Sequence, residues 1–289
     1  MIADIVISGL INGSVYALLA IGFSLIFGAA RIVNLAHTAF YMVASYCIYF
    51  ATHKMGVHPV LAMLVAIVLV TLIGLVCYQL FINPIREHEA AVLIATIAVA
   101  MAMQEIMLLI FTGDYLSVPA LVMGYLRIIG VKIAYQQLLT FGVALLILAG
   151  VWAVLMKTRL GLAVRSTAQD REVANLMGMN ESRVAMITMA ISVGLAAFAG
   201  AVVVPLKVVD PHMWMHPLIM MMAVVVLGGL GSLKGSFVGS YILGLAESLV
   251  VFLIPMGAFL KGSVALSIMI AVLLIRPEGL FGIAFEEER

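Results

Sequence analysis

Long apolar runs separated by short polar breaks dominate the chain. Because a transmembrane helix needs about 20 mostly apolar residues, the pattern predicts an all-α integral membrane protein. We expect a polytopic bundle of eight or nine transmembrane or re-entrant helices. The count stays open because two of the runs are shorter than about 17 residues. The nine runs are 5–28, 38–52, 59–81, 91–111, 136–156, 184–206, 217–230, 236–254 and 260–276, of which 38–52 and 217–230 are the short ones.

Composition agrees with this pattern and excludes several classes of protein. Hydrophobic residues make up 65% of the 289 positions and charged residues 10%, with a mean hydropathy of +1.24. No soluble core of this length buries so much apolar surface, so residues 1–289 form a single transmembrane domain. The net charge of +1 gives no reason to expect a nucleic-acid partner.

The first run lacks a basic flank and is too long for a signal peptide, so we expect it to be a retained span.

The basic residues predict the orientation. Five of the 15 Lys and Arg residues lie in the loop 157–183, and positively charged loops stay on the cytoplasmic side. With nine crossings the N-terminus is outside, the C-terminus is inside, and inner loops carry ten basic residues against five outside. We therefore expect the loop 157–183 and the C-terminus to be cytoplasmic.

Cysteine and histidine patterns offer no redox or metal chemistry. Cys47 and Cys77 lie in apolar runs without CxxC spacing, so they are interpreted as small packing residues. The six histidines show no ligand spacing such as HExxH. We expect no metal site in this chain.

The loop 157–183 mixes charges with apolar positions such as Leu162, Val164 and Leu176, which is typical of short amphipathic helices. A solvated connector between two spans is the alternative interpretation. Within the loop, the sequence E-x-A-x-x-x-G at Glu172, Ala174 and Gly178 resembles the cytoplasmic coupling motif of ATP-binding cassette (ABC) importer permeases.

The resemblance extends along the whole chain. Four stretches in the same order are similar to the LivH-type permeases of branched-chain amino acid ABC importers, namely 9–46, 161–202, 224–248 and 273–282. One departure concerns Thr38, which stands where the family commonly has glycine, so the local turn is expected to differ.

The resemblance implies a transport subunit rather than an enzyme, in a bacterial-type inner membrane and in contact with lipid. Expected partners are a second permease subunit, giving a heterodimer, two ATP-binding subunits and an extracytoplasmic substrate-binding protein. No cofactor is expected on this chain, because it has no GxxxxGK[ST] loop and ATP and Mg belong to the partner ATPase. The solute is a branched-chain amino acid or, as in related permeases, urea, an amide or another small solute. The residues expected to couple to the ATPase are Arg165, Asp170, Arg171, Glu172, Ala174 and Gly178.

Polar side chains within apolar runs are candidates for the translocation path, because such groups usually face the bundle interior or a water-lined cavity. Hydrogen bonding to a neighbouring helix is the structural alternative, and helix capping explains Asn34 equally well. The candidates are Tyr16, Asn34, His37, Gln104, Glu105 and Glu247.

The glycine-rich stretch 228–244 predicts either a discontinuous helix or close packing of small residues between helices. A discontinuous helix aims its backbone dipoles at a charged solute near the middle of the membrane. The candidate hinge or close-packing positions are Gly228, Gly229, Gly231 and Gly235.

An ABC permease has two alternatives as the function of this chain. An ion-coupled secondary transporter needs paired ionisable groups inside the membrane, and the sequence shows no buried basic partner for Glu105 or Glu247. It also leaves the coupling-like loop unexplained. A membrane-embedded enzyme needs a cluster of nucleophile, base or metal ligands, which the scattered His and Cys residues do not provide.

Overall fold

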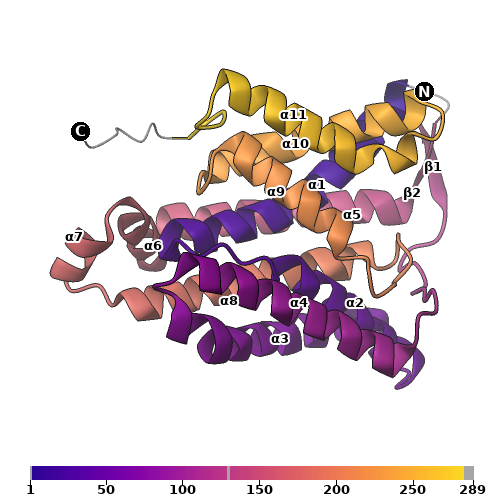
Figure 1. The fold of residues 1–289 in the computed structure, drawn as a ribbon. Coiled ribbons are helices and arrows are strands. Elements are labelled where there is room, and N and C mark those ends of the chain that lie inside the picture. Colours follow the sequence, from indigo (N-terminus) through magenta and orange to yellow (C-terminus); the bar gives the residue numbers. More distant parts are fainter. Residues whose placement is uncertain (1, 129–130, 283–289) are drawn as a thin grey trace.

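A computed structural model describes residues 2–128 and 131–282 (Figure 1). Within these residues, each predicted apolar run corresponds to one long helix whose ends lie within a few residues of the prediction. These helices are α1 (Ile2–Ala30), α2 (His37–His53), α3 (Pro59–Cys77), α4 (Glu89–Phe111), α5 (Tyr135–Lys157), α8 (Glu181–Val203), α9 (Met215–Gly228), α10 (Leu233–Leu253) and α11 (Lys261–Ile275).

Six of these helices are long and apolar enough to cross a membrane: α1, α3 with its extension to Ile85, α4, α5, α8 and α10. Helices α2, α9 and α11 have 17, 14 and 15 residues. At about 1.5 Å per residue they are about 21 to 26 Å long, somewhat less than a hydrocarbon core of about 30 Å. The described chain is therefore a polytopic helical membrane protein with six candidate spans.

One element contradicts a purely helical fold. Strands β1 (Tyr125–Ile128) and β2 (Val131–Ala134) form an antiparallel hairpin in the connection between α4 and α5, with Leu126 opposite Ile133. Strands of four residues are too short for an alternating pattern to stand out beside long apolar runs, which explains why the sequence did not predict them. Shorter irregular pieces are a π-helical turn at Tyr78–Ile82 and 3-10 turns at Asn83–Ile85 and Gly257–Phe259.

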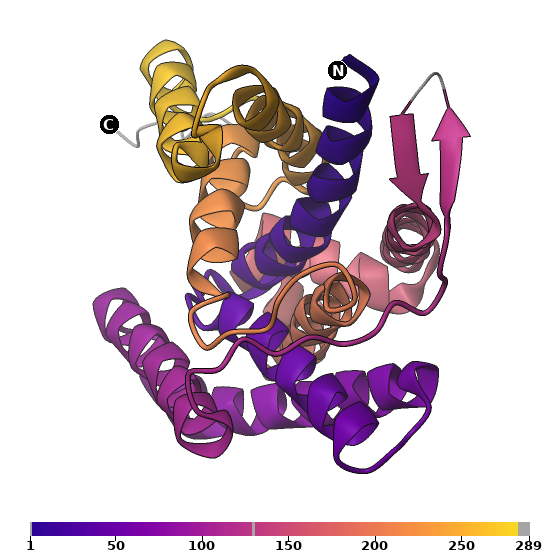
Figure 2. The same cartoon turned by 90° about the vertical axis from the view of Figure 1, so that its right-hand side faces the viewer.

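Helix α1 forms the centre of the bundle. Within its most apolar window 83% of the residues are buried, against 22% for α3, α4 and α5. Viewed end-on, α1 and α8 lie inside, while α3 and α4 lie at one edge and α11 at the opposite edge (Figure 2). The outer helices expose large apolar side chains such as Leu64, Leu72 and Leu146, which is stable only against lipid or another apolar partner.

Glycines allow α1 to cross α10 closely. Gly13 of α1 and Gly244 of α10 face each other, and an added Cβ at Gly244 would lie 2.6 Å from the backbone nitrogen of Gly13. Small residues at such a contact let two backbones approach, which is the usual way in which helices pack where apolar burial cannot drive association. The crossing places Tyr16, one turn further along α1, beside α10.

The two ends of the bundle carry different elements (Figure 1). At one end lie two short helices, α6 (Arg159–Gln169) and α7 (Arg171–Leu176), together with the last described residues of the chain. The N-terminus and the β1–β2 hairpin lie at the other end. There the α8–α9 connection is tied to the α4–α5 connection by two backbone hydrogen bonds between Leu116 and Val209, of 3.0 and 2.8 Å.

Candidate functional site

Consecutive helix caps shape the loop 157–183. The Thr158 hydroxyl accepts a hydrogen bond from the Gly161 amide (3.1 Å) at the start of α6. The Asp170 carboxylate then accepts one from the Val173 amide (3.0 Å) and starts α7 in a new direction. Side-chain oxygens at these positions satisfy amide groups that have no partner inside the helix. The predicted amphipathic helices are therefore present in the structure.

The E-x-A-x-x-x-G motif has a clear structural basis at its last two positions. Gly178 has a φ of +84°, and its amide bonds the Asn175 carbonyl (2.9 Å) while the Met179 amide bonds the Ala174 carbonyl (3.0 Å). This pair of bonds is the Schellman ending of a helix, which favours glycine because only glycine adopts positive φ without strain. Ala174 is buried at 4% exposure, so a small residue suits that position.

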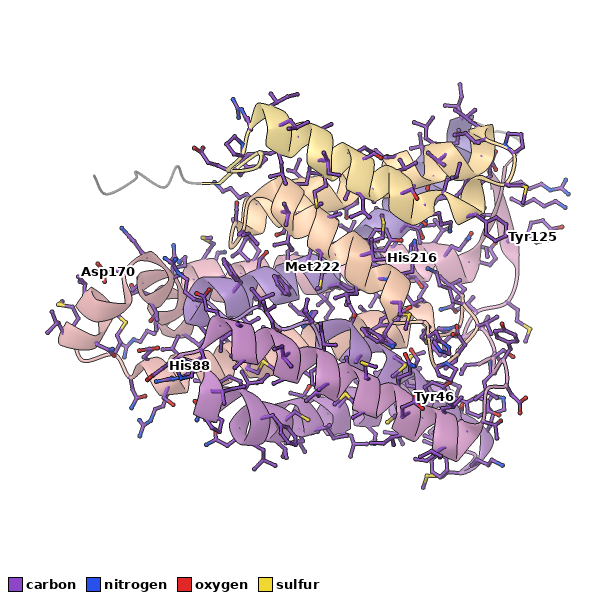
Figure 3. All side chains as sticks on the ribbon, viewed as in Figure 1. Tyr46, His88, Tyr125, Asp170, His216 and Met222 are labelled. Carbon is purple, nitrogen blue, oxygen red and sulfur yellow. The ribbon has the colours of Figure 1, made fainter. Side chains whose placement is uncertain are left out.

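An apolar surface on α7 has no partner among the described residues. Leu176 and Met177 are 86% and 77% exposed at the end of the bundle where Asp170 also lies (Figure 3). Arg165 is exposed on α6, where its guanidinium bonds the Gly161 carbonyl (3.4 Å). Arg171 and Glu172 belong to α7 by their backbone, and their side chains lie outside the described part. Exposed apolar side chains on charged helices are typical of a protein-binding surface.

The glycine-rich stretch combines a chain break with very close packing. Gly229 and Gly231 have positive φ (+97° and +80°) in the turn between α9 and α10. A Cβ at either Gly228 or Gly235 would overlap the backbone of the other. Gly231 packs against the end of α1 near Gly28, which in turn lies close to Ala168 of α6. The break thus lies at the α6 end of the bundle rather than in its middle, and the geometry favours close packing over a dipole aimed at solute.

The last described segment completes this turn. The amides of Leu280 and Phe281 bond the carbonyls of Leu227 and Gly228 (2.8 and 3.0 Å), which end α9 and have no partner within it. Gly279 has a φ of +80° and lies against Gly229. The end of the stretch 273–282, one of the four that resemble the family, therefore caps α9. Residues 283–289, with the C-terminus, lie outside the described part.

Glu247 is the centre of a buried polar cluster. Its side chain is 1% exposed. The Tyr16 hydroxyl donates to Oε2 at 2.6 Å and Lys261 Nζ lies 3.0 Å from Oε1, so α1, α10 and α11 meet at this carboxylate. The sequence showed no basic partner for Glu247, and this expectation was wrong, because Lys261 lies in the next helix of the chain and reaches back across the packing contact. A paired carboxylate avoids most of the cost of burying a charge alone.

Two further side chains interact electrostatically with the groups of this cluster. Lys207, in the α8–α9 connection, interacts electrostatically with both Glu247 and Lys261. His216 of α9 interacts with the same groups, and its ring centroid is 6.4 Å from that of Tyr16. His216 lies in the half of the bundle nearer to Tyr125 of the hairpin, away from Asp170 (Figure 3). The sequence missed Lys207, His216 and Lys261 because none stands in the middle of an apolar run.

Gln104 and Glu105 have different surroundings. Gln104 is buried, and its Oε1 accepts a bond from Trp214 Nε1 (2.8 Å), which attaches α4 to the α8–α9 connection. Glu105 is exposed on the outer side of α4 and receives a long bond from the Gln104 amide (3.4 Å). Within this chain only Gln104 therefore points into the bundle, and Glu105 does not join Glu247.

Asn34 and His37 pack at the start of α2. The Asn34 side chain accepts a bond from the Ala36 amide (3.1 Å), which is a local turn of the kind that precedes helices. His37 is fully buried and its Nδ1 lies 3.2 Å from the Ser192 hydroxyl of α8. Thr38 lies within the first turn of α2, a position that does not require glycine. His37 therefore connects α2 to α8, whereas Asn34 closes the turn before α2.

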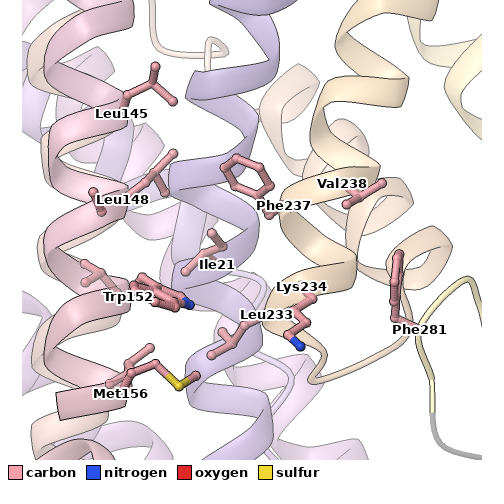
Figure 4. Close-up of a pocket in the computed structure, with 13 residues that line it drawn as sticks. Ile21, Leu145, Leu148, Trp152, Met156, Leu233, Lys234, Phe237, Val238 and Phe281 are labelled. Atoms are coloured by element: carbon pink, nitrogen blue, oxygen red, sulfur yellow. The ribbon is translucent and has the colours of Figure 1, made fainter. Parts of the chain in front are cut away.

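An open groove of about 680 Å³ lies between α5 and α10, with Ile21 of α1 at its base (Figure 4). Leu148 and Trp152 form one wall, Phe237 and Val238 form the other, and Lys234 is the one ionisable side chain among the described residues that line it. Such a surface suits lipid chains or another helix. The polar candidates for the path lie elsewhere.

Comparison with known proteins decides which kind of protein carries these features. Residues 5–274 match the family described as branched-chain amino acid transport system, permease component. The chain belongs to this family. Similar proteins include the high-affinity branched-chain amino acid transport system permease protein BraD of Pseudomonas aeruginosa, with 31% identity over 96% of this chain and 94% of BraD. The corresponding protein LivH of Escherichia coli is 29% identical over 95% of this chain and 94% of LivH.

As a member of this family the chain is the permease subunit of an ABC importer, and the resemblance seen in the sequence is confirmed. It is a multi-pass membrane transport subunit and not an enzyme, and ATP is hydrolysed by a separate subunit. A solved structure, PsaBC from Streptococcus pneumoniae in complex with Fab, shares its fold with a TM-score of 0.56, 16% identity, and coverage of 96% of this chain and 97% of that one.

Proposed function

We propose that this permease carries branched-chain amino acids across the bacterial inner membrane. The proposal is supported by similarity over nearly the full chain to permeases named for that transport. The importer contains a second permease of the same family as a heterodimeric partner, two ATP-binding subunits and an extracytoplasmic binding protein. ATP and Mg bind to the ATPases, and this chain binds no cofactor. All nine long helices cross the membrane, with α2, α9 and α11 as short spans shielded by their neighbours.

In this proposal α6 and α7 are the cytoplasmic docking site for an ATPase, which places the loop 157–183 and the C-terminus inside and the hairpin outside. The observation that carries it is the free apolar pair Leu176 and Met177 on α7. The coupling residues are Arg165, Asp170, Arg171, Glu172, Ala174 and Gly178, of which Asp170 and Gly178 fix the ends of α7. Closure of the ATPases moves this helix pair, and the movement reaches the path through α6, which packs on α1 and α5.

Leu176→Asn tests the docking site, because the exposed Leu176 side chain is largely unburied within the chain itself and its loss should not destabilise the fold. We expect the variant to insert normally, to lose most of the co-purifying ATPase and to lose uptake. Gln169→Ala is the matched control, since it alters an exposed side chain of α6 and leaves the apolar pair intact. Unchanged ATPase recovery with Leu176→Asn argues against docking through α7.

The solute is tested by purifying the complete importer and measuring ATP hydrolysis with binding protein loaded with leucine, isoleucine or valine. Stimulation by these amino acids supports the proposal. If the chain is recovered alone from gentle detergents and its uptake follows an ion gradient, an ion-coupled secondary transporter replaces it.

A further inference from the structure

The groove between α5 and α10 has apolar walls and one basic end. Its volume of about 680 Å³ lies within the range of about 300–1,000 Å³ that is typical of ligand sites. Lys234 lines the groove at the end where Met156 also lies, and Leu145 lies at the other end (Figure 4). None of the described residues that line the groove is acidic. A molecule that matches this lining has an apolar body and a negative charge at one end.

A second cation reaches the same end of the groove. The Nη1 atom of Arg165, in α6, lies 3.7 Å from the sulfur of Met156, which is a lining residue. The elements that carry the two cations meet at the end of α1, because a Cβ at Gly28 would lie 3.7 Å from Ala168 of α6 and 3.8 Å from Gly231, just before α10. The positive charge at this end therefore comes from two separate helices.

The two cations are not neutralised by the acidic residues of the neighbouring segments. Neither Lys234 nor Arg165 forms an ion pair with another described residue. Asp170, at the end of α6, accepts the Val173 amide and caps α7. Glu278 precedes Phe281 in the chain but does not line the groove, whereas Phe281 does. Both cations are exposed and available to an external anion.

The basic end of the groove lies at the depth of lipid headgroups. Helix α5 has 23 residues and is about 35 Å long at about 1.5 Å per residue, slightly more than a hydrocarbon core of about 30 Å. Met156 is the last residue but one of α5 and Lys234 is the second residue of α10, so both lie at the end of a span. Trp152 and Phe237 lie further into the span and are exposed, so the groove is open along its apolar part.

We propose that the groove binds an anionic phospholipid, with an acyl chain between α5 and α10 and the phosphate group against Lys234 and Arg165. Ammonium and guanidinium groups form charge-assisted hydrogen bonds with phosphate, and basic pockets between transmembrane helices bind anionic headgroups. An apolar helix of another protein fits the walls but leaves both cations without an anion. The bound lipid links α6, which belongs to the proposed docking site, to α10. The inference does not depend on which solute is transported.

Photochemical labelling tests the site in the complete importer. Proteoliposomes contain the importer and a trace of phosphatidylglycerol or phosphatidylcholine with a diazirine on one acyl chain, and labelled peptides are identified by mass spectrometry. We expect phosphatidylglycerol to label the lining segments 145–156 and 233–238 about tenfold or more above phosphatidylcholine, because two cations contribute. Both lipids should label the exposed apolar face of α3 equally.

Substitution of Lys234 tests the part played by charge. Lys234→Gln should lower the ratio of the two labels about fivefold, which corresponds to about 1 kcal/mol. Lys234→Arg should keep the ratio, because arginine also binds phosphate. Arg183→Gln is the matched control, since it removes an exposed cation at the start of α8, at the same end of the bundle but outside the lining, and it should leave the ratio unchanged. Assembly of each variant is checked by size-exclusion chromatography.

Two results would overturn the site. Equal labelling of the lining segments by both lipids, or an equal fall with Lys234→Gln and Arg183→Gln, would mean that anionic lipid is attracted only to the basic end as a whole. Trp152→Cys, made in a background where Cys47 and Cys77 are replaced by Ala and coupled to a benzophenone maleimide, tests the other occupant. Cross-linking to lipid supports the proposal, and cross-linking to the second permease subunit would assign the groove to the interface between subunits.

Discussion

At the end of the bundle that carries α6 and α7, Leu176 and Met177 stand free in solvent, whereas in the opposite half Glu247 is enclosed and both of its oxygens have partners. The first surface is made from one continuous stretch of 27 residues and is incomplete without another protein. The second is assembled from α1, α10, α11 and the α8–α9 connection and is largely complete within the chain. Substitutions in the two regions should therefore have different effects. Those on α7 should impair coupling to the ATPase, and those in the Glu247 cluster should impair folding.

Glu247→Ala should have the largest effect. It leaves the Lys261 ammonium group without its carboxylate and Tyr16 without its acceptor. Breaking a buried ion pair by removing one partner costs about 3–5 kcal/mol, and the lower part of that range applies because Lys261 is 30% exposed. We expect little folded importer to survive mild heating, measured by size-exclusion chromatography. Glu105→Ala is the control, because Glu105 is an exposed carboxylate that also lies in an apolar run, and this variant should survive heating normally. Equal losses of folded importer in the two variants would show that the two carboxylates do not differ in their contribution to stability.

Gly178→Val should abolish most uptake while the protein still inserts. A β-branched residue at a φ of +84° is strained by about 1–2 kcal/mol, so the end of α7 changes shape and the apolar pair is displaced. Uptake and ATPase co-purification are the measurements. Gly142→Val in α5 is the control, because a Cβ there meets nothing within 4 Å. Normal uptake by Gly178→Val would show that α7 does not need this ending to function.

Tyr16→Phe should have an intermediate effect in the polar cluster. It removes one hydrogen bond to Glu247 and keeps the ion pair with Lys261, so the expected cost is about 1–3 kcal/mol. The midpoint temperature of loss of folded importer should fall, though by less than in Glu247→Ala. A fall as large as that of Glu247→Ala would mean that the bond from the Tyr16 hydroxyl of α1, and not the ion pair between α10 and α11, gives this cluster most of its stability.

Asp170→Ala should have the smallest effect. Loss of the cap on α7 costs about 1 kcal/mol and lets the helix fray without unfolding the bundle. Hydrogen exchange at Val173 should become faster and uptake should fall modestly. Asp170→Asn is the control, since asparagine caps as well as aspartate. If Asp170→Asn loses as much uptake as Asp170→Ala, the negative charge matters to the ATPase in addition to the cap.

Much of the fold was predictable because it depends on local pattern. Each of the nine apolar runs became a helix, since length and hydropathy are properties of a continuous segment. The two helices of the loop 157–183 followed from the same reasoning. The β1–β2 hairpin was not predicted, because four-residue strands carry too little pattern of their own. The hydrophobic pattern also could not predict the number of full spans. Helices α2, α9 and α11 are so short that whether they cross the membrane depends on the helices around them.

The candidate site was predicted less completely. Glu105 and Glu247 look alike in the sequence, each a carboxylate in an apolar run beside a polar neighbour, yet one is exposed and the other is the centre of a cluster. Which of the two carboxylates is buried depends on how each helix is rotated about its own axis. That rotation is set by packing against other helices. His37 joins α2 to α8, and Asn34 closes the local turn before α2.

The sequence by itself determined the membrane class, the helices and the family, because each depends on the residues of continuous stretches of the chain. Only the tertiary structure decided that Lys261 and Tyr16 share Glu247, and that Gly228 packs on Gly235. The physical reason is that a buried charge is stable only with partners at hydrogen-bond distance, and those partners come from whichever helices the packing brings together.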